Sequence, residues 1–481
     1  MAGEWKETTL GECAAWLSGG TPFKGNEAFW SGTIPWVSAK DMKSFRLHDA
    51  EDHISPLAVG NGGKLVPAGT ILLLVRGMTL HNDVPICMVT REMAFNQDIK
   101  ALRPAKNVDG AFLAYWLLAN KPELLASVDH AGHGTGRLVT DTLKEMPVLR
   151  PPLAEQKAIA AVLGALDDKI ELNRRMNATL EAMARALFQS WFIDFDPVRQ
   201  NMDRNQPSPQ PSPRGRGSQS GNLPSPPGRR AGDEGAPGMD FDPVRAKLDD
   251  RKPVGMDAET AALFPDSFQE SEMGHIPKGW TVGKVNDVAT LNRGAVNPGH
   301  FPTETFDHYS LPAYDNGRTP KLELGSAIMS NKFIVTPNSV LLSKLNPHIP
   351  RIWLPDLHAS RRSVCSTEFM VACSKPGVSR EYLFSLFTCS AFSSIYGTLV
   401  TGTTGSHQRI RPESVLEMKI VIPSAPLIQA FTAIAKPMFD SINRNTEQSH
   451  TLATLRHTLL PKLLSGELNV GELEDERREY V

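Results

Sequence analysis

Two loops rich in glycine, threonine and serine carry the side chains of this sequence that are best suited to bind a polyanion. The first loop, HAGHGTGRLV, spans residues 130–139, and the second, TGTTGSHQRI, spans residues 401–410. Backbone N–H groups, hydroxyls, Lys and Arg donate to phosphate oxygens, while Arg, Asn and Gln can pair with base edges through two hydrogen bonds. Both loops are therefore predicted to contact DNA, with simple solvation as the alternative for any single cation.

Further cations, hydroxyls and amides near glycine-rich turns extend this candidate set in both halves of the chain. Arg409 stands beside a hydroxyl-rich loop, which favours a phosphate over a base as its partner. The candidates are Lys24, Lys40, Arg76, His133, Thr135 and Arg137 in the first half, and Arg293, Lys344, Asn346, Arg351, Thr403, Ser406, Gln408 and Arg409 in the second.

Sequence motifs of catalysis are missing. The chain has no GxxxxGK[ST] loop, no GxGxxG after a strand, no HExxH and no GxSxG. Residues 346–349 (Asn-Pro-His-Ile) approach the Asn-Pro-Pro-aromatic turn of adenine methyltransferases, but the second proline and the aromatic residue are absent. No catalytic residue is therefore assigned to this chain.

Composition excludes several classes of protein. The net charge of −2 argues against a uniformly basic DNA binder, although a local basic face is enough for binding. The five cysteines show no CxxC spacing, so we expect reduced thiols and no metal site. No apolar run reaches the roughly 18 residues that a membrane span needs, and the start MAGEWKETTL does not look like a signal peptide. A cytoplasmic protein is expected.

The chain contains an internal repeat. WKETTLGECAAWLSGG from Trp5 aligns without a gap with WTVGKVNDVATLNRGA from Trp280, and LKEMPVLRPP from Leu143 is similar to VLEMKIVIPS from Val415. The residues between these matches diverge. A period of this length indicates duplicated domains rather than a solenoid. Two domains that are alike at their ends and different in between suggest one protein that recognises two different targets.

Each copy mixes strand and helix patterns, which predicts the α+β class. TILLLVRG from Thr70 and VLLSKL from Val340 are short apolar runs typical of buried strands. FLAYWLLANKPELLASV from Phe112 and YLFSLFTCSAFSSIY from Tyr382 have helical periodicity.

A long helix follows each copy. From Leu153 to Phe192, apolar residues recur at alternating steps of four and three, which is typical of a coiled-coil seam. About 40 residues at ~1.5 Å each give a rod of roughly 60 Å. A matching stripe starts at Phe431, with Pro437 predicted to kink this helix or delay its start. The predicted pairing residues are Ile159, Leu163, Leu166, Ile170, Asn173, Asn177, Leu180 and Leu187, with Ile442, Asn445, Leu452 and Leu459.

Both stripes turn polar in the middle, at Asn173 and Asn177 and again at Asn445 and Ser449. If the helices pack antiparallel, these polar groups meet and can fix the register. Two independent amphipathic helices, each lying on its own domain, are the alternative.

Residues 200–238 have a different composition from the rest. They are rich in Pro, Gly, Ser and Arg and contain little that could be buried, so they are predicted to be disordered. The direct repeat DFDPVR, at Asp194 and again at Asp240, brackets them and indicates an inserted element. An Arg-rich arm that touches nucleic acid is the alternative.

Several segments resemble specificity (S) subunits of type I restriction–modification systems. PPLAEQKAIAAVLGALDDKIELNRRMNATLEAMARALFQSWFIDFDPV resembles their central conserved region, GHIPKGW the entry to their second half, and TLATLRHTLLPKLLSGEL their closing helix. LLSKLNPHIPRIWLP and GTTGSHQRIRPE resemble parts of their target recognition domains. The likeness covers nearly the whole chain except residues 200–238.

This resemblance implies a non-catalytic subunit that binds double-stranded DNA with a bipartite site. It also implies a pseudo-two-fold repeat, with two paired antiparallel helices that dock methyltransferase (M) subunits, usually two. S-adenosylmethionine belongs to the M subunits, and ATP and Mg to restriction (R) subunits, so this chain is expected to bind no cofactor and no metal.

The predicted boundaries follow from the repeat and the resemblance. For the function, two alternatives to a DNA-reading subunit remain. One is a single chain that fuses a methyltransferase with a specificity protein, and the other is a scaffold that binds other proteins. The predicted segments are recognition domain 1 (1–150), the central helix (151–195), a linker with the insert (196–275), recognition domain 2 (276–422), the C-terminal helix (423–466) and a tail (467–481).

Overall fold

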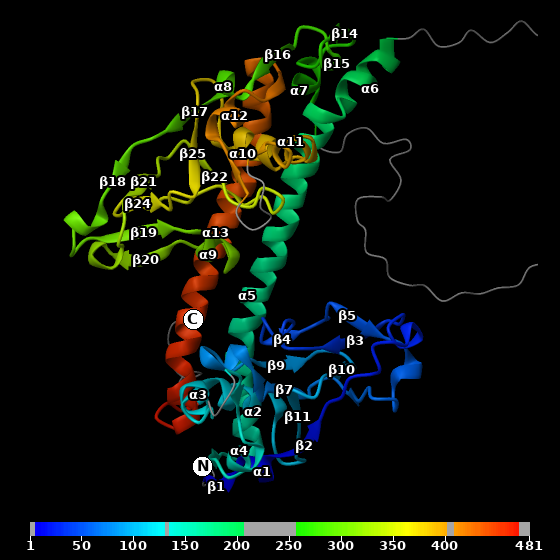
Figure 1. Ribbon diagram of the computed structural model, residues 1–481, viewed down its shortest axis with the longest axis vertical. Helices are drawn as coiled ribbons and strands as arrows, with labels where there is room; N and C mark the ends of the chain where they lie inside the picture. Colours follow the sequence, from blue (N-terminus) through cyan, green and yellow to red (C-terminus); the bar gives the residue numbers. More distant parts are fainter. Residues whose placement is uncertain (1–4, 130–133, 206–255, 402–407, 471–481) are drawn as a thin grey trace, which may run out of the picture. The chain divides into compact units, whose positions relative to one another are not determined.

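The computed structural model describes residues 5–129, 134–205, 256–401 and 408–470, and these residues form an α+β protein, as the sequence predicts. The chain divides into two compact units. The first contains Met1–Met176 with Arg444–Val481, and the second contains Asn177–Asn443. Figure 1 shows that each unit contains both sheets and helices.

The first unit is built around a strand that is buried along its whole length. The four aliphatic side chains of β7 (Ile71–Leu74) have no exposed surface, which a continuous apolar run favours. Besides two short strand pairs, this unit contains two larger sheets (Figure 1). The five-stranded sheet has the order β2 (Ala14–Ser18), β11 (Ile99–Pro104), β7, β9 (Ile86–Val89) and β4 (Arg46–Leu47), and the four-stranded sheet has the order β5 (Asp52–Ile54), β3 (Ile34–Val37), β10 (Met93–Phe95) and β6 (Leu65–Val66).

The helical stretch predicted from Phe112 forms two helices rather than one. The Asp109 carboxylate accepts hydrogen bonds from the first backbone N–H groups of α2 (Gly110–Ala119), and α3 (Lys121–Ala126) follows after Asn120. Pro122 lies in the first turn of α3, where its missing N–H costs nothing. The short elements of this unit are η1 (Glu27–Phe29), η2 (Pro56–Ala58), β8 (Arg76–Gly77), η3 (Met78–His81) and β12 (Gly136–Arg137).

The two matched ends of each sequence repeat are strand partners. β1 (Lys6–Thr9) pairs antiparallel with β13 (Pro147–Arg150), and β16 (Thr281–Lys284) pairs antiparallel with β28 (Lys419–Ile422). A one-turn helix follows the first strand of each pair, and another precedes the second. These helices are α1 (Leu10–Cys13), α4 (Thr140–Lys144), α8 (Val285–Val288) and α12 (Pro412–Leu416). In each repeat, the first strand therefore lies beside the last strand.

The second unit repeats the strand order at one end of the five-stranded sheet of the first unit. β25 (Phe369–Ser374) lies between β17 (Ala289–Asn292) and the fully buried β22 (Ser339–Ser343), as β11 lies between β2 and β7. β22 then pairs with β23 (Ile352–Trp353). A five-stranded sheet of this unit has the order β18 (Ala295–Val296), β21 (Lys332–Ile334), β24 (Arg362–Cys365), β19 (Thr305–Tyr309) and β20 (Lys321–Leu324). A separate strand pair is formed by β26 (Val400–Thr401) and β27 (Arg409–Ile410). The helices are η5 (Pro298–His300), α9 (Leu311–Asp315), η6 (Gly325–Ala327), α10 (Arg380–Thr388) and α11 (Ser390–Tyr396).

Two long helices contribute residues to both units. They are α5 (Leu153–Phe188), which continues as a π-helical turn (Gln189–Ile193), and α13 (Ala425–Ser465). α13 runs through Pro437, so the predicted delay of its start is wrong. Every residue predicted for helix pairing is buried or half-buried.

Side chains of α5 and α13 contact each other within each unit. In the first unit, Asn173 Nδ2 donates to Asn445 O at 3.2 Å, to Gln448 Oε1 at 3.0 Å and to Ser449 Oγ at 3.2 Å. In the second unit, Asn177 Nδ2 donates to Ile442 O at 3.4 Å. The predicted polar positions Asn173, Asn177, Asn445 and Ser449 thus take part in hydrogen bonds between the two helices, as does the pair of Arg456 with Asp167.

The predicted linker at 196–275 contains regular structure where it is described. α6 (Asp196–Asn205), α7 (Ala258–Ala262) and the hairpin of β14 (Phe268–Ser271) with β15 (Gly274–Pro277) lie in it. Residues 200–205 of the predicted disordered segment thus belong to a helix, and 206–238 lie outside the described residues. The buried Val198 anchors this helix, which composition alone does not indicate.

Candidate nucleic-acid interface

Arg76 and Arg137 face each other on a short strand pair in the first unit. β8 follows the buried strand β7 almost directly and pairs antiparallel with β12, which places Arg137 opposite Arg76. Both side chains are exposed. Arg137 also pairs through its backbone with Asp129, so one acidic residue lies beside the two arginines. Like charges directly opposite each other on a ladder repel. This strand pair therefore concentrates positive charge that a polyanion would neutralise.

Glycine and histidine shape the turn that leads into Arg137. Gly134 has a φ of +74°, and its carbonyl oxygen is joined to His81 Nε2 by a hydrogen bond of 2.7 Å. A Cβ on Gly136 would lie 2.8 Å from the Leu80 Cβ, so a side chain there does not fit. Thr135 is half-buried, and the candidate His133 lies outside the described residues.

Lys344, Asn346, Gln408 and Arg409 come together in the second unit. The segment after β22 runs beside β27, because Asn346 N donates to Gln408 O at 3.0 Å and Ile410 N donates to Lys344 O at 3.0 Å. The candidates Thr403 and Ser406 lie outside the described residues. Two candidates from one segment and two from another, more than 60 positions further along the chain, thus lie together in this unit.

The charges in this cluster are partly balanced by an acid. Arg409 Nη2 donates to Glu368 Oε1 at 2.8 Å, and Lys344 Nζ lies 5.6 Å from the centre of the Phe333 ring. Burial lowers the pKa of Lys344; the Glu368 carboxylate opposes this shift, and the Arg409 charge adds to it. A phosphate would compete with Glu368 for the Arg409 guanidinium.

A turn accounts for the Asn-Pro-His-Ile sequence at 346–349. Asn346 has a φ of +51°, a conformation that asparagine tolerates better than most residues, and Ile349 N donates to Asn346 O at 2.9 Å. His348 Nε2 is joined to Gln408 Oε1 by a hydrogen bond of 2.7 Å. This segment is a connection between β22 and β23 that is tied to the loop before Arg409.

The two clusters occupy equivalent places in their sheets. Leu138 N donates to Val75 O at 2.9 Å in the first unit, as Ile410 N does to Lys344 O in the second. Each cluster therefore joins the chain leaving a buried strand to the strand that follows a glycine-rich loop. In this comparison Arg137 corresponds to Arg409. In each unit a histidine of this connection also bonds to the glycine-rich loop, His81 to the Gly134 carbonyl oxygen and His348 to the Gln408 side chain.

The remaining candidates lie elsewhere, and most are paired with acids. Lys24 is exposed on a loop, while Lys40 Nζ lies 3.2 Å from Glu51 and 3.0 Å from Asp52. Arg293 pairs with Glu413 at 2.6 Å, and Arg351 donates to both oxygens of Asp315 at 2.7 and 2.9 Å. The structure does not bring these four into either cluster.

Sequence reasoning missed the residues that support the clusters. Glu368, His348 and His81 contact candidate residues or their loops. Glu368 and His81 stand in no motif, and His348 was considered only as part of the Asn-Pro-His-Ile sequence, not as a support for the loop. Glu368 is 41 positions from Arg409, and only the pairing of β22 with both neighbours brings them together. The His81 and His348 positions could have been found by asking which residues follow each predicted buried strand.

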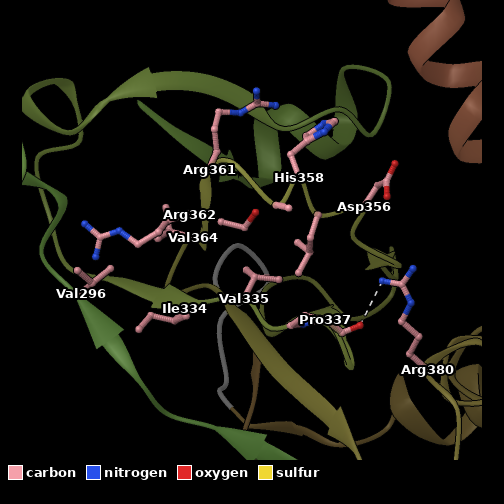
Figure 2. A pocket seen from close by; sticks show the side chains of 13 residues that line it. Val296, Ile334, Val335, Pro337, Asp356, His358, Arg361, Arg362, Val364 and Arg380 are labelled. Carbon is pink, nitrogen blue, oxygen red and sulfur yellow. Dashed lines mark hydrogen bonds between the residues drawn. The ribbon is translucent and has the colours of Figure 1, made fainter. Parts of the chain in front are cut away.

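A cavity of about 460 Å³ in the second unit is lined by three arginines, as Figure 2 shows. Arg361 Nε donates to the fully buried Asp307 at 3.0 Å, Arg362 Nε donates to Glu304 at 2.6 Å, and Arg380 Nη1 donates to Pro337 O at 3.3 Å, the dashed line in Figure 2. The cavity's charges are therefore largely neutralised by the protein itself, which makes it a poor phosphate site.

The described residues contain neither a metal-ligand cluster nor a helix suited to span a membrane. No group of three or more His, Cys, Asp or Glu side chains in them could hold a metal ion. None of their helices is long and apolar enough to cross a membrane.

Comparisons with known proteins agree on one family. Residues 2–182 match the family model of the type I restriction modification DNA specificity domain. The chain is 25% identical to the type I restriction enzyme MjaIX specificity subunit of Methanocaldococcus jannaschii, over 98% of this chain and 95% of that one. It is 24% identical to the HindI specificity subunit of Haemophilus influenzae, over 97% and 100% of the two chains.

One of the similar solved structures is the S subunit of a type I restriction–modification system from M. genitalium, with a TM-score of 0.48, 11% identity and 96% of each chain covered. By its family match over residues 2–182 and its two relatives, the chain is similar over nearly its whole length to specificity subunits of type I restriction–modification systems, as the resemblance of its sequence predicts.

Proposed function

We propose that this chain is the DNA-reading subunit of a type I restriction–modification complex. Residues 1–150 and 276–422 would each read one half of a bipartite site in double-stranded DNA. One observation carries the proposal: the same strand-pair framework is built twice, around Arg137 and around Arg409, with different side chains on it. Because the backbone arrangement is the same in both domains but the polar side chains on it differ, each domain can recognise a different DNA sequence.

The two clusters divide DNA contacts by chemistry. Exposed cations such as Arg76 and Arg137 can neutralise phosphates, which gives affinity without sequence preference. Amides such as Asn346 and Gln408 can form paired hydrogen bonds with adenine edges. We assign Arg409 to a phosphate, because it stands beside a hydroxyl-rich loop and its side chain stays mostly exposed although Glu368 accepts from one of its nitrogens.

Catalysis is assigned to partners. In this proposal two M subunits bind S-adenosylmethionine and methylate adenine, and R subunits supply ATP- and Mg-dependent cleavage, while this chain contributes no catalytic group and no cofactor. The long helices α5 and α13 would form the antiparallel pair of a pseudo-two-fold repeat and dock the M subunits. Supporting this are the hydrogen bonds of Asn173 and Asn177 to residues of α13. The complex would act in the cytoplasm of a bacterium or archaeon.

The experiment is a methylation assay with labelled S-adenosylmethionine and DNA. Purified chain alone should transfer no label, and chain co-purified with its M subunits should methylate one bipartite sequence. Methylation by the chain alone would favour the fused methyltransferase instead. Co-purification of partners without any salt-dependent shift of DNA would favour the protein-binding scaffold.

A further inference from the structure

An exposed apolar side chain lies beside the candidate cluster in each unit. Met78 follows β8 directly and is 65% exposed, and Ile349 ends the turn that starts at Asn346 and is 60% exposed. Single exposed apolar residues are common on protein surfaces, so exposure alone indicates nothing. Their places in the two sheets are what make these two informative.

Met78 and Ile349 lie on equivalent connections. Met78 lies between the antiparallel strands β7 and β9, and Ile349 lies between the antiparallel strands β22 and β23. Each of these strand pairs is followed along the chain by the glycine-rich loop that ends in Arg137 or Arg409. The same connection therefore presents a large apolar side chain in both units, although the two sequences differ there.

Histidine hydrogen bonds hold each connection against its glycine-rich loop. His81, three residues after Met78, bonds to Gly134 O at 2.7 Å, and His348, next to Ile349, bonds to Gln408 Oε1 at 2.7 Å. Each apolar side chain is thus tied to the segment that carries the cluster's arginine. A surface that holds apolar and cationic groups together suits a ligand with both an apolar edge and negative charge.

DNA presents one such apolar edge in its major groove, the C5 methyl group of thymine, between its phosphates. We infer that Met78 and Ile349 are specificity-determining residues that pack against a thymine methyl group, one in each half-site. This inference rests on the proposed function and deepens it. Met78 is unbranched and flexible, whereas Ile349 is branched and stiff, so the two would favour thymine at different positions relative to their arginines.

The test replaces thymine by deoxyuridine, which lacks only the C5 methyl group. Once the bipartite site is known from methylation, each thymine in it is replaced in turn, and binding is measured for the full chain in the assembly in which it purifies. One thymine in each half-site should weaken wild-type binding about fourfold when replaced, because a buried methyl group contributes ~0.8 kcal/mol. Met78→Ala should lose this sensitivity in the first half-site only, and Ile349→Ala in the second only.

Matched controls are Leu57→Ala and Leu322→Ala, which truncate side chains that are 65% and 58% exposed in the same two units but away from the clusters. Both should keep the wild-type response to every replacement, and all four variants should keep the wild-type melting temperature. Ile349→Val should retain part of the response.

Two outcomes would overturn the inference in distinguishable ways. If the wild-type chain prefers a sequence but Met78→Ala and Ile349→Ala respond to deoxyuridine as it does, the inference fails alone. If the wild-type assembly shows no preference for any sequence, the proposed function fails and the inference fails with it.

Discussion

Arg137 lies directly across the β8–β12 ladder from Arg76, so two side chains of like charge stand together on one strand pair. Such an arrangement costs stability in the free protein, on the order of a few tenths of a kcal/mol at an exposed site. The pair follows the fully buried strand β7, so two positive charges lie next to the core of this unit.

Replacing Arg137 by Ala should therefore weaken DNA binding without harming the fold. We expect lower affinity for all sequences and a salt slope smaller by about one, since one phosphate contact is lost. The free energy of unfolding should stay the same or rise slightly. Arg103→Ala, which removes another exposed arginine of this unit, is the control and should leave the salt slope unchanged. A loss confined to the specific sequence would assign Arg137 to a base instead.

Glu368 should act against DNA binding through Arg409. Glu368→Gln removes the carboxylate that competes with phosphate for this arginine, so affinity should rise on every sequence, measured by titration at several salt concentrations. Stability should change by less than about 1 kcal/mol, because Arg409 is mostly exposed and Glu368 is partly exposed. Glu272→Gln, which removes the acid paired with Lys419, should not affect binding. An unchanged affinity in Glu368→Gln would contradict the placement of DNA beside Arg409.

The sequence predicted what depends on periodicity and repetition. Matching segments at Trp5 and Leu143, and at Trp280 and Val415, correspond to strand pairs that join the start and end of each repeat. The alternating steps of four and three predicted α5, because burial along a helix follows that period.

Contacts between side chains far apart in the sequence could not be predicted from periodicity or repetition. The candidate Arg351 is neutralised by Asp315 and Lys40 by Glu51 and Asp52, and no pattern in the sequence announces these pairs. Both glycine-rich loops were identified, but their histidine bonds depend on which connection folds beside them. The pairing of Glu368 with Arg409 could not be predicted for the same reason, because it depends on which strands lie side by side.

A charge in the apolar core to which both α5 and α13 contribute should unfold the first unit. Leu163 has no exposed surface and belongs to one apolar cluster with Leu460 and Leu463. Leu163→Asp buries an unpaired charge and should lower the free energy of unfolding by about 3 kcal/mol or more. Leu172→Asp, on the same helix but 43% exposed, should change it by less than about 0.5 kcal/mol. Equal denaturant midpoints for the two variants would argue that the helices do not pack as described.

Acid should destabilise the second unit through His308. Burial lowers the pKa of His308 below its ordinary value near 6.5, although Glu323, 2.6 Å from Nδ1, opposes the shift. The unfolded chain therefore binds the proton more readily, and stability present above pH 6.5 is lost as the pH falls below it. His308 Nε2 is buried without a partner among the described residues, so protonation adds an unpaired donor.

Denaturant unfolding at pH 7.5 and 5.5 measures this effect. The wild-type chain should lose more stability between these values than His308→Gln, which cannot titrate there. His300→Gln, a change at an exposed histidine of the same unit, should behave as wild type. The same loss in all three proteins would exclude His308 as its source.

The central claim is that two separate readers recognise two half-sites, and sequencing of DNA methylation in cells tests it most directly. Cells that express this chain with its M subunits would be compared with cells whose chain carries residues 1–150 of a relative. We predict a bipartite adenine-methylated sequence in the first cells and, in the second, a sequence with one half changed and the other half retained. Methylation that does not depend on this chain, or a change in both halves at once, would contradict the account.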